Sequence, residues 1–308
     1  MPDLNVQLAP NHPKGLVLAN PVMTASGTFG YGIEYSELID VQKLGAIICK
    51  GTTLNPRDGN PQPRLVETAY GVLNSIGLEN VGVDAVVKEK APVWSKWSVP
   101  VIVNIAGETI NEYKKVAGKL EGVKGISAIE INISCPNVSS GGIEFCSNGT
   151  SAAKVTKAVK SISTLPVIVK LSPNVADIVE IALAVQEAGA DSITVINTLR
   201  GMAIDINQRR PVLGNTTGGL SGPAIKPIAL YMVYKVAGAV EIPVIGCGGI
   251  NCSSDAVEFI MAGATAVQVG TANLSNPRAA LDVLDGIEQF MTRNNMPNME
   301  ALRGRARI

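Results

Sequence analysis

The sequence is almost devoid of histidine, since His12 is the only one in 308 residues. Catalytic triads of the Ser-His-Asp and Cys-His types need an imidazole as their base. Such chemistry is therefore excluded unless His12, in the loop APNHPKG, supplies it. A general base has to be sought among cysteine, lysine, aspartate and glutamate.

Cysteines are few, and their spacing is uninformative for metal binding. Cys49, Cys135, Cys146, Cys247 and Cys252 make an odd number, and none forms a C-x-x-C pair. Neither a disulfide framework nor a zinc site is indicated, and we expect no metal on this chain. Any iron–sulfur cluster must lie on another chain. We expect all of these cysteines except Cys135 to be inert, buried thiols.

The chain also lacks net charge and long apolar runs. Its formal charge is zero with scattered Lys and Arg, which leaves no electrostatic footprint for nucleic acid or an anionic membrane. No apolar run approaches the ~18 residues of a membrane helix, and the start MPDLNVQLAP has no signal-peptide layout. We expect a soluble, cytoplasmic protein whose basic tail, LRGRARI, is a solvated end.

Short apolar strands, by contrast, recur along the chain in two series. SVPVIVNI, TLPVIVKL and EIPVIGCG each open with proline, which is tolerated at the first position of a strand. LGAIICK, AGADSITVIN and AGATAVQVG each have a glycine at their second position, of the kind that ends a helix, and the strand starts almost at once after it. Helical periodicity at 178–185 and 257–262 precedes the last two, with Ile178, Leu183 and Phe259 among the apolar positions.

Eight strands result when NPVMTAS and SAIEINIS are added. Their predicted ends lie near Ser26, Lys50, Asn104, Asn132, Lys170, Asn197, Gly248 and Gly270. Eight alternating units favour a closed (β/α)8 TIM barrel over a doubly wound sheet, which carries fewer strands. We expect one domain over 1–308, with an N-terminal β-hairpin, LNVQLAPNHPKGLVLAN, at the barrel floor. Segments 51–99 and 198–241 exceed one helix and predict inserted loops or ribbons above the carboxyl-end face.

Polar residues gather at the predicted carboxyl ends of these strands, where barrel active sites lie. They are Ser26, Lys50, Asn104, Asn132, Lys170 and Asn197. One such residue could simply bond its own loop, but six indicate a site. The glycine-rich turns IGCGGI and VGTAN after the last two strands could bind a phosphate of a substrate or of flavin mononucleotide, with a helix N-terminus adding its dipole. Tight packing explains glycine equally well.

Two strand-end lysines and one cysteine are candidates for a role in catalysis or ligand binding. Burying Lys170 or Lys50 is expensive without an anionic partner. Lys170 could form a Schiff base or lie against the N1/O2 edge of a reduced flavin, and Lys50 could bind a substrate carboxylate; structural ion pairs are the alternative. Cys135, in NISCPN, could act as a base because nearby cations lower a thiol pKa from about 8.5. Pro136 ends the strand, and VSSGG at 138–142 predicts a mobile lid.

Long motifs along nearly the whole chain closely resemble the class 1 dihydroorotate dehydrogenases. They are NISCPN, ICKGTT, YGVLNSIGLEN, VIVNIAG, VIVKLSPN, VINTLRGMAID, GGLSGPAIKP, IGCGGI and VGTAN. The resemblance implies a barrel with FMN bound by Ser26, Lys50, Gly51, Asn104, Asn132, Lys170, Ile196, Gly222, Gly248, Gly249, Gly270 and Thr271. It implies substrate contacts from Lys50, Asn74, Ser75, Ile76, Gly77, Leu78, Asn132, Asn197 and Thr198, with Cys135 as the catalytic base.

The same resemblance implies oxidation of (S)-dihydroorotate to orotate in de novo pyrimidine (UMP) synthesis. Cys135 would take the C5 proton, and FMN N5 would accept the C6 hydride. NTLRGMAID favours the B-type, in which a partner subunit carrying a 2Fe–2S cluster and FAD passes electrons to NAD+. The usual assembly is a heterotetramer built on a homodimer of this chain. Cys146 departs from the family, where glycine is common, and leaves the mobility of the lid in doubt.

Three other interpretations stay open at this point. An A-type enzyme would work as a homodimer with fumarate. A Schiff-base aldolase would use Lys170 and would be colourless. A barrel that only binds phosphate would leave Cys135 and the asparagines without a role.

Overall fold

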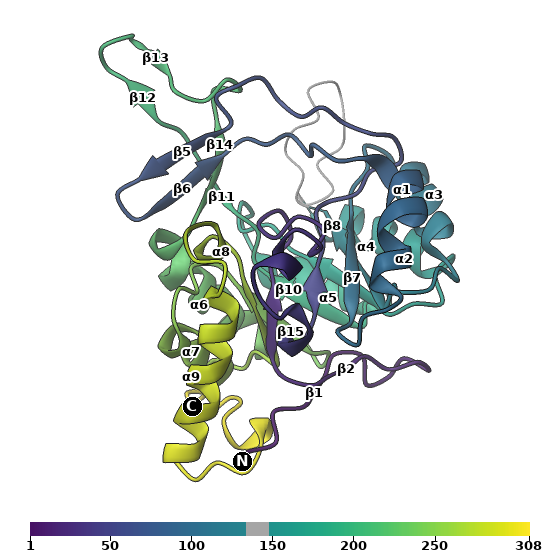
Figure 1. Ribbon diagram of the computed structural model, residues 1–308, viewed down its shortest axis with the longest axis vertical. Coiled ribbons are helices and arrows are strands. Elements are labelled where there is room, and N and C mark those ends of the chain that lie inside the picture. The colour runs from purple at the N-terminus through teal and green to yellow at the C-terminus, as the bar shows by residue number, and fades with distance from the viewer. Residues whose placement is uncertain (134–147) are drawn as a thin grey trace.

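A closed barrel of parallel strands forms the centre of the computed structural model, which describes residues 1–133 and 148–308 (Figure 1). Its strands are β3 (Val22–Thr24), β4 (Ile47–Ile48), β7 (Val101–Ile105), β8 (Ala128–Asn132), β9 (Val167–Lys170), β10 (Ser192–Val195), β15 (Val244–Cys247) and β16 (Ala266–Val269). The order β3-β16-β15-β10-β9-β8-β7-β4 follows the chain around the barrel. The N–H of Gly45 donates to the carbonyl of Val22 (2.8 Å) and thereby joins the first and last strands of that order. The predicted (β/α)8 architecture is confirmed.

The strands form where β-branched residues run without interruption. Every residue of β9 and β10 is buried, as expected for parallel strands that are covered on both faces. All eight predicted ends lie within two residues of the observed ones. Because parallel strands present their carboxyl ends to one face, the polar residues at those ends are brought together.

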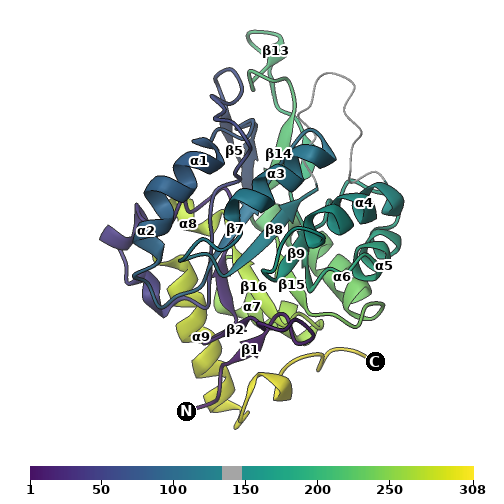
Figure 2. The ribbon, with the colours of Figure 1, turned by 90° about the vertical axis from the view of Figure 1, so that its right-hand side faces the viewer.

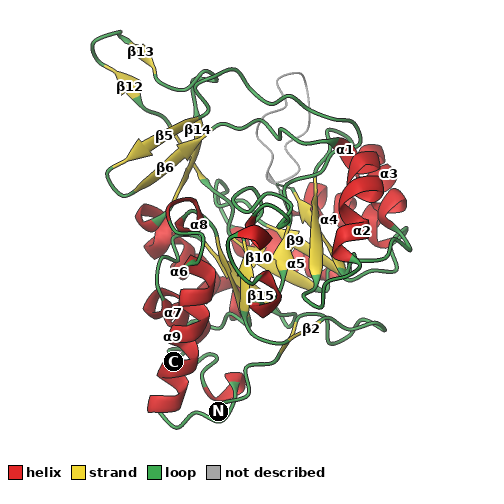
Figure 3. Cartoon of the chain, in the orientation of Figure 1, coloured by secondary structure: helices red, strands yellow, loops and turns green. Residues whose placement is uncertain are grey.

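Helices surround this barrel (Figure 3). They are α1 (Gly82–Ala85), the π-helical turn η3 (Val86–Lys90), α2 (Ala91–Trp94), α3 (Ile110–Leu120), α4 (Gly149–Lys160), α5 (Ile178–Glu187), α6 (Lys226–Ala237), α7 (Ser253–Met261), α8 (Ala272–Ser275) and α9 (Ala279–Arg293). Two short 3-10 turns, η1 (Tyr35–Glu37) and η2 (Val41–Lys43), stand between β3 and β4, so the first unit is less regular than the repeat predicted.

Side-chain caps explain where several helices start. Thr109 accepts the N–H of Glu112 before α3 (3.2 Å), and Asp177 accepts the N–H of Val179 before α5 (2.8 Å). Both predicted helical segments are confirmed as α5 and α7. In α5, however, Leu183 is exposed rather than in the core, because Ala182 occupies the position that faces the barrel.

The N-terminal hairpin closes the end of the barrel opposite the inserted ribbons (Figure 2). Strands β1 (Val6–Gln7) and β2 (Val17–Leu18) pair antiparallel, and Leu8 and Leu18 are fully buried in the core. The predicted hairpin is confirmed. His12 lies in its turn, where its N–H donates to the carbonyl of Ala9 (3.2 Å), so the lone imidazole is at the wrong end for chemistry at the strand carboxyl ends.

The two long insertions combine into one antiparallel sheet above the barrel. The first supplies β5 (Leu65–Thr68) and β6 (Gly71–Asn74); the second supplies β11 (Leu199–Gly201) and β14 (Gly218–Ser221). Their order is β11-β14-β6-β5, with β12 (Ile204–Asp205) and β13 (Arg210–Pro211) extending beyond it as a separate ribbon (Figure 1). The predicted ribbons are confirmed, and their union in one sheet is an additional finding.

The C-terminal tail is not the solvated end expected from its composition. The Arg307 guanidinium donates to the carbonyls of Tyr234 (2.7 Å) and Ala262 (3.1 Å) and lies over the Tyr234 ring. These carbonyls belong to the ends of α6 and α7, where a cation is favoured by the helix dipole. The tail therefore ties two neighbouring helices together.

The closure of the barrel makes a specific prediction for Gly45. A Cβ at this position would lie 2.1 Å from the carbonyl oxygen of Asn20, so Gly45→Ala should lower the free energy of unfolding by about 1–3 kcal/mol, as overpacking does. Urea denaturation measures this. Gly118→Ala is the matched control, because the nearest atom is 3.5 Å away and an exposed helical glycine should gain about 0.5–1 kcal/mol. Equal effects of the two variants would contradict the assigned contact.

Candidate active site

A cavity of about 430 Å³ opens at the carboxyl ends of the barrel strands, beneath the sheet formed by the insertions. This size suits a small-molecule site. Its lining includes every residue predicted to bind the cofactor: Ser26, Lys50, Gly51, Asn104, Asn132, Lys170, Ile196, Gly222, Gly248, Gly249, Gly270 and Thr271. The strand-end residues therefore face one shared space.

The predicted substrate-binding residues divide into two groups. Lys50, Asn74, Ile76, Leu78, Asn132, Asn197 and Thr198 line the cavity. Ser75 and Gly77 do not: the Ser75 hydroxyl accepts from the Asn60 amide (2.9 Å), and a Cβ on Gly77 would lie 2.5 Å from the same side chain. The two residues therefore lie behind the cavity wall and brace it.

The asparagines reach the cavity from different parts of the chain. Asn132 ends β8 and Asn197 follows β10, and the Asn197 amide nitrogen donates to the Asn132 oxygen (3.2 Å). Asn74 comes from the upper sheet, where its amide donates to the carbonyl of Gly219 on β14 (3.2 Å). Amide groups thus stand on both the floor and the roof of the cavity.

The two strand-end lysines differ in their surroundings. Lys170 is buried and donates to the Gln268 oxygen (3.1 Å) and the Cys247 sulfur (3.6 Å). Burial favours its neutral amine, but Cys247 and Glu130 favour the ammonium more strongly, so the pKa of Lys170 lies above its ordinary value. Lys50 is only half-buried, contrary to expectation, and has no acidic partner within residues 1–133 and 148–308. Among the described residues that line the cavity, Lys50 is therefore the cation available to an anionic ligand.

Below the cavity lies a buried carboxylate that sequence reasoning missed. Glu130 on β8 is fully buried and accepts from the Asn104 amide nitrogen (2.7 Å), the Thr194 hydroxyl (2.8 Å) and the Gln268 amide nitrogen (2.7 Å). The Asn104 oxygen is buried and has no hydrogen-bond partner in the described part of the chain. The sequence does contain a signal, since Glu130 and Gln268 each stand between two apolar residues inside a strand, in AIEIN and AVQV.

A second missed residue, Asn80, anchors the loop that carries Ile76 and Leu78. Its amide donates to the carbonyl of Leu78 (2.7 Å) and the hydroxyl of Thr53 (2.8 Å), and its oxygen accepts the N–H of Gly82 (2.8 Å). Leu78 has a φ of 56°, a conformation that side chains disfavour. Asn80 therefore holds a strained wall of the cavity in place.

The turn after β15 requires glycine for steric reasons. Gly248 and Gly249 have φ values of 130° and 77°, and a Cβ on Gly249 would lie 2.7 Å from the backbone nitrogen of Lys226. Both glycines also line the cavity. The packing explanation considered for IGCGGI is therefore correct and is compatible with ligand contact at the same turn.

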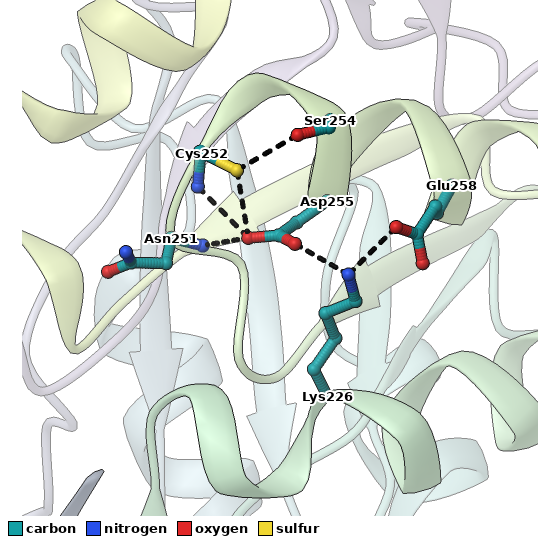
Figure 4. A network of polar contacts seen from close by, with 6 residues as sticks. All are labelled: Lys226, Asn251, Cys252, Ser254, Asp255 and Glu258. Atoms are coloured by element: carbon teal, nitrogen blue, oxygen red, sulfur yellow. Dashed lines mark hydrogen bonds and ion pairs between the residues drawn. The ribbon is translucent and has the colours of Figure 1, made fainter. Parts of the chain in front are cut away.

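The start of α7, next to this turn, already holds an anion of its own (Figure 4). The Asp255 carboxylate accepts the N–H groups of Asn251 (2.8 Å) and Cys252 (3.0 Å) and pairs with Lys226 (2.6 Å), which also binds Glu258 (2.8 Å). These two N–H groups are therefore already used, and a ligand phosphate would contact the glycine turn instead. The start of α7 should accordingly contribute less to phosphate binding than the sequence suggests.

The cysteines do not behave alike. Cys49 is fully buried, and burial raises its pKa to about 12, so it is inert as expected. Cys247 lines the cavity, where burial raises its pKa also. Cys252 is exposed at the start of α7, so the expectation of a buried thiol was wrong there. Cys135 and Cys146 lie outside the described residues, as do Pro136 and 138–142.

Two further properties concern the described part of the chain alone. No group of three or more His, Cys, Asp or Glu side chains within it is arranged to hold a metal ion. None of its helices combines the length and the apolar character needed to cross a lipid bilayer.

Comparisons with known proteins agree on one family. The model of the family described as dihydroorotate dehydrogenase matches residues 10–291. The protein named dihydroorotate dehydrogenase B (NAD(+)), catalytic subunit, from Desulforamulus reducens is 57% identical over 293 residues, which cover 95% of this chain and 96% of that protein. Proteins with the same name from Geobacter sulfurreducens and Geotalea daltonii are 54% and 52% identical, over 98% and 100% of this chain and 98% and 99% of theirs.

The contacts of Asp255 predict a pH-dependent contribution to stability. Burial alone would raise its pKa, but Lys226 and the N–H groups at the start of α7 lower it on balance. A lowered pKa stabilises the fold above the ordinary carboxyl range, and this stabilisation is lost as the pH falls through the lowered value. Asp255→Asn should therefore unfold more easily than wild type by roughly 1–2 kcal/mol at pH 7, and the gap should close in acid.

Thermal unfolding between pH 7 and pH 2 measures this difference. Asp282→Asn is the control, because Asp282 pairs with Arg278 at an exposed site, where an ion pair contributes at most about 1 kcal/mol. A gap for Asp255→Asn that stays constant with pH would exclude the carboxylate as its source.

Proposed function

The chain belongs to the dihydroorotate dehydrogenase family, and from that premise we propose that it is the catalytic subunit of a B-type, NAD+-linked enzyme oxidising (S)-dihydroorotate to orotate. The observation that carries this proposal is the gathering of the strand-end lysines, asparagines and glycines around one cavity at the mouth of the barrel. The relatives over 50% identical bear the name of that subunit. The reaction belongs to de novo pyrimidine synthesis.

FMN fits the residues that are present. The Asn104 oxygen has no partner among the described residues and is an acceptor that calls for a donor from a ligand. The Lys170 ammonium places positive charge at the cavity wall. The turn at Gly248 and Gly249 brings backbone close to the cavity, as a phosphate tail requires. We therefore assign FMN to this cavity, with residues 1–308 acting as one FMN-binding domain.

The chain's own residues bind and orient the substrate. Bound FMN would supply the hydride acceptor for C6 at its N5 position. The available ammonium of Lys50 binds the substrate carboxylate, while Asn74, Asn132 and Asn197 pair with the amide edges of the ring. Ile76, Leu78 and Thr198 complete the substrate wall, which Ser75 and Gly77 brace from behind. Groups on floor and roof together hold the C5–C6 bond in one orientation.

The base in this proposal is Cys135, which takes the proton from C5. Support comes from the motif NISCPN and from the unsuitability of other ionisable groups in the described lining. Glu79 pairs with Arg64 (2.8 Å), Cys247 is held beside Lys170 (3.6 Å), and the pKa of Lys170 is raised. That raised pKa also opposes a Schiff-base aldolase, which needs a neutral lysine amine.

The electrons leave through a partner subunit. We place FAD and a 2Fe–2S cluster on that subunit, which passes electrons to NAD+, and we propose a heterotetramer built on a homodimer of this chain. A cytoplasmic location, expected from the sequence, is part of the same proposal. The A-type alternative differs in needing no partner and in using fumarate.

The isolated chain should be yellow, with an absorption band near 450 nm typical of oxidised flavin, and anaerobic dihydroorotate should bleach it. The chain alone should reduce neither NAD+ nor fumarate at a catalytic rate. Visible spectra before and after substrate addition measure the first result, and acceptor assays measure the second. A colourless preparation that cannot be loaded with FMN would contradict the proposal, and rapid fumarate turnover would indicate the A-type.

Cys135→Ser should keep FMN but lower the rate of flavin bleaching by dihydroorotate roughly 10²-fold or more, the usual scale for a lost general base. Anaerobic stopped-flow absorbance at 450 nm measures the rate. Cys252→Ser is the matched control, because this thiol is exposed and should leave the rate unchanged. Bleaching at wild-type speed in Cys135→Ser would remove that residue from the mechanism.

A further inference from the structure

The buried carboxylate of Glu130 lies outside the cavity lining but is hydrogen-bonded to Asn104, which does line the cavity. Glu130 is fully buried on β8 and is not among the described residues that line the cavity. A carboxylate in such a place is tolerated only when its oxygens receive hydrogen bonds. Asn104, Thr194 and Gln268 supply them at 2.7–2.8 Å.

An ionised carboxylate accepts hydrogen bonds and donates none, so it dictates how the neighbouring amides are turned. The amide nitrogens of Asn104 and Gln268 must both face Glu130. Their oxygens consequently face away from it. The Gln268 oxygen accepts from the Lys170 ammonium (3.1 Å), and the Asn104 oxygen, on a residue that lines the cavity, has no partner within the described residues.

An amide oxygen that faces the cavity favours a ligand group that donates a hydrogen bond. The oxidised isoalloxazine ring has a single ring N–H group, at N3, whereas its N1 and N5 nitrogens and its two carbonyl oxygens are acceptors. If the Asn104 amide were flipped, its NH2 group would face the ligand, and an NH2 group cannot accept a hydrogen bond from N3–H. A fixed orientation also avoids reorganisation when the ligand binds.

We propose that Glu130 is a positioning residue for the flavin: it fixes the Asn104 amide so that its oxygen accepts a hydrogen bond from N3–H. Through Gln268, the same carboxylate fixes the acceptor that holds the Lys170 ammonium. The inference rests on the proposed function, because it presupposes that FMN occupies the cavity. It adds a residue outside the cavity lining that determines which ligand edge the cavity accepts.

The test compares FMN with N3-methyl-FMN, which lacks the N3 proton. Wild-type apoprotein should prefer FMN by about tenfold or more, the scale of one buried hydrogen bond whose acceptor would otherwise be unsatisfied. In Glu130→Gln the isosteric amide can donate as well as accept, so Asn104 is no longer held in one orientation. The affinity for FMN should fall by about tenfold, and the preference over N3-methyl-FMN should shrink by a similar factor. Titration of apoprotein, followed by flavin fluorescence, measures both constants.

Two variants separate positioning from general stability. Ser192→Ala changes another fully buried polar side chain, on the same strand as Thr194, that has no partner within the described residues, and it should leave the preference unchanged. Gln268→Met removes the bonds of Gln268 to Lys170 and Glu130 but keeps the Glu130–Asn104 bond, so it should also retain the preference. If Glu130→Gln does not fold, Glu130→Asp replaces it in the test. Aspartate is one methylene shorter, so its carboxylate is withdrawn from Asn104, and the preference for FMN over N3-methyl-FMN should again shrink.

The outcomes distinguish a failure of this inference from a failure of the proposed function on which it rests. A Glu130 variant that loses affinity for both flavins equally, with the preference intact, would show a merely structural role and overturn the inference. A wild-type protein that binds neither flavin would instead overturn the proposed function. A preference that falls in the Glu130 variant and survives in both controls supports the assignment.

Discussion

Two buried ionisable side chains in the largely apolar interior of this barrel need polar partners, and that constraint determines the floor of the cavity above them. Glu130 and Lys170 are both buried, and burying either side chain without polar partners would be expensive. Asn104, Thr194 and Gln268 meet this requirement for Glu130, and Gln268 extends the network to Lys170. The polar floor of the cavity is thus a set of hydrogen bonds in which each donor and acceptor has a fixed direction.

Floor and roof of the cavity are built by different means. Strand ends of the barrel supply the floor, where parallel pairing holds side chains such as Asn132 and Lys170 in register. The insertions supply the roof, where Asn74 is held by a contact with the distant Gly219 and Leu78 by a bond from the neighbouring Asn80. In the proposed reaction the floor holds the flavin, and groups from both layers surround the dihydropyrimidine ring.

Much of the floor is predictable from the sequence, whereas the tertiary contacts that hold the roof over it are not. Strand ends were located correctly because proline, glycine and β-branched runs act locally. The pairing of Asn74 with Gly219, 145 residues apart, depends on tertiary contacts that no local pattern encodes. Glu130 and Gln268 lie within strands, so a prediction based on polar residues at strand ends does not include them. Leu183 and Cys252 were misjudged because helix position, not residue type, decided their exposure.

The most direct measurement is a crystal structure of the chain with FMN and orotate bound. The account predicts the isoalloxazine ring over the polar floor, with the Asn104 oxygen within hydrogen-bond distance of N3, the Lys170 ammonium at the N1/O2 edge, and orotate between the ring and Cys135. A flavin bound elsewhere on the chain, or an Asn104 amide nitrogen directed at the ring while Glu130 accepts no bond from it, would contradict the account.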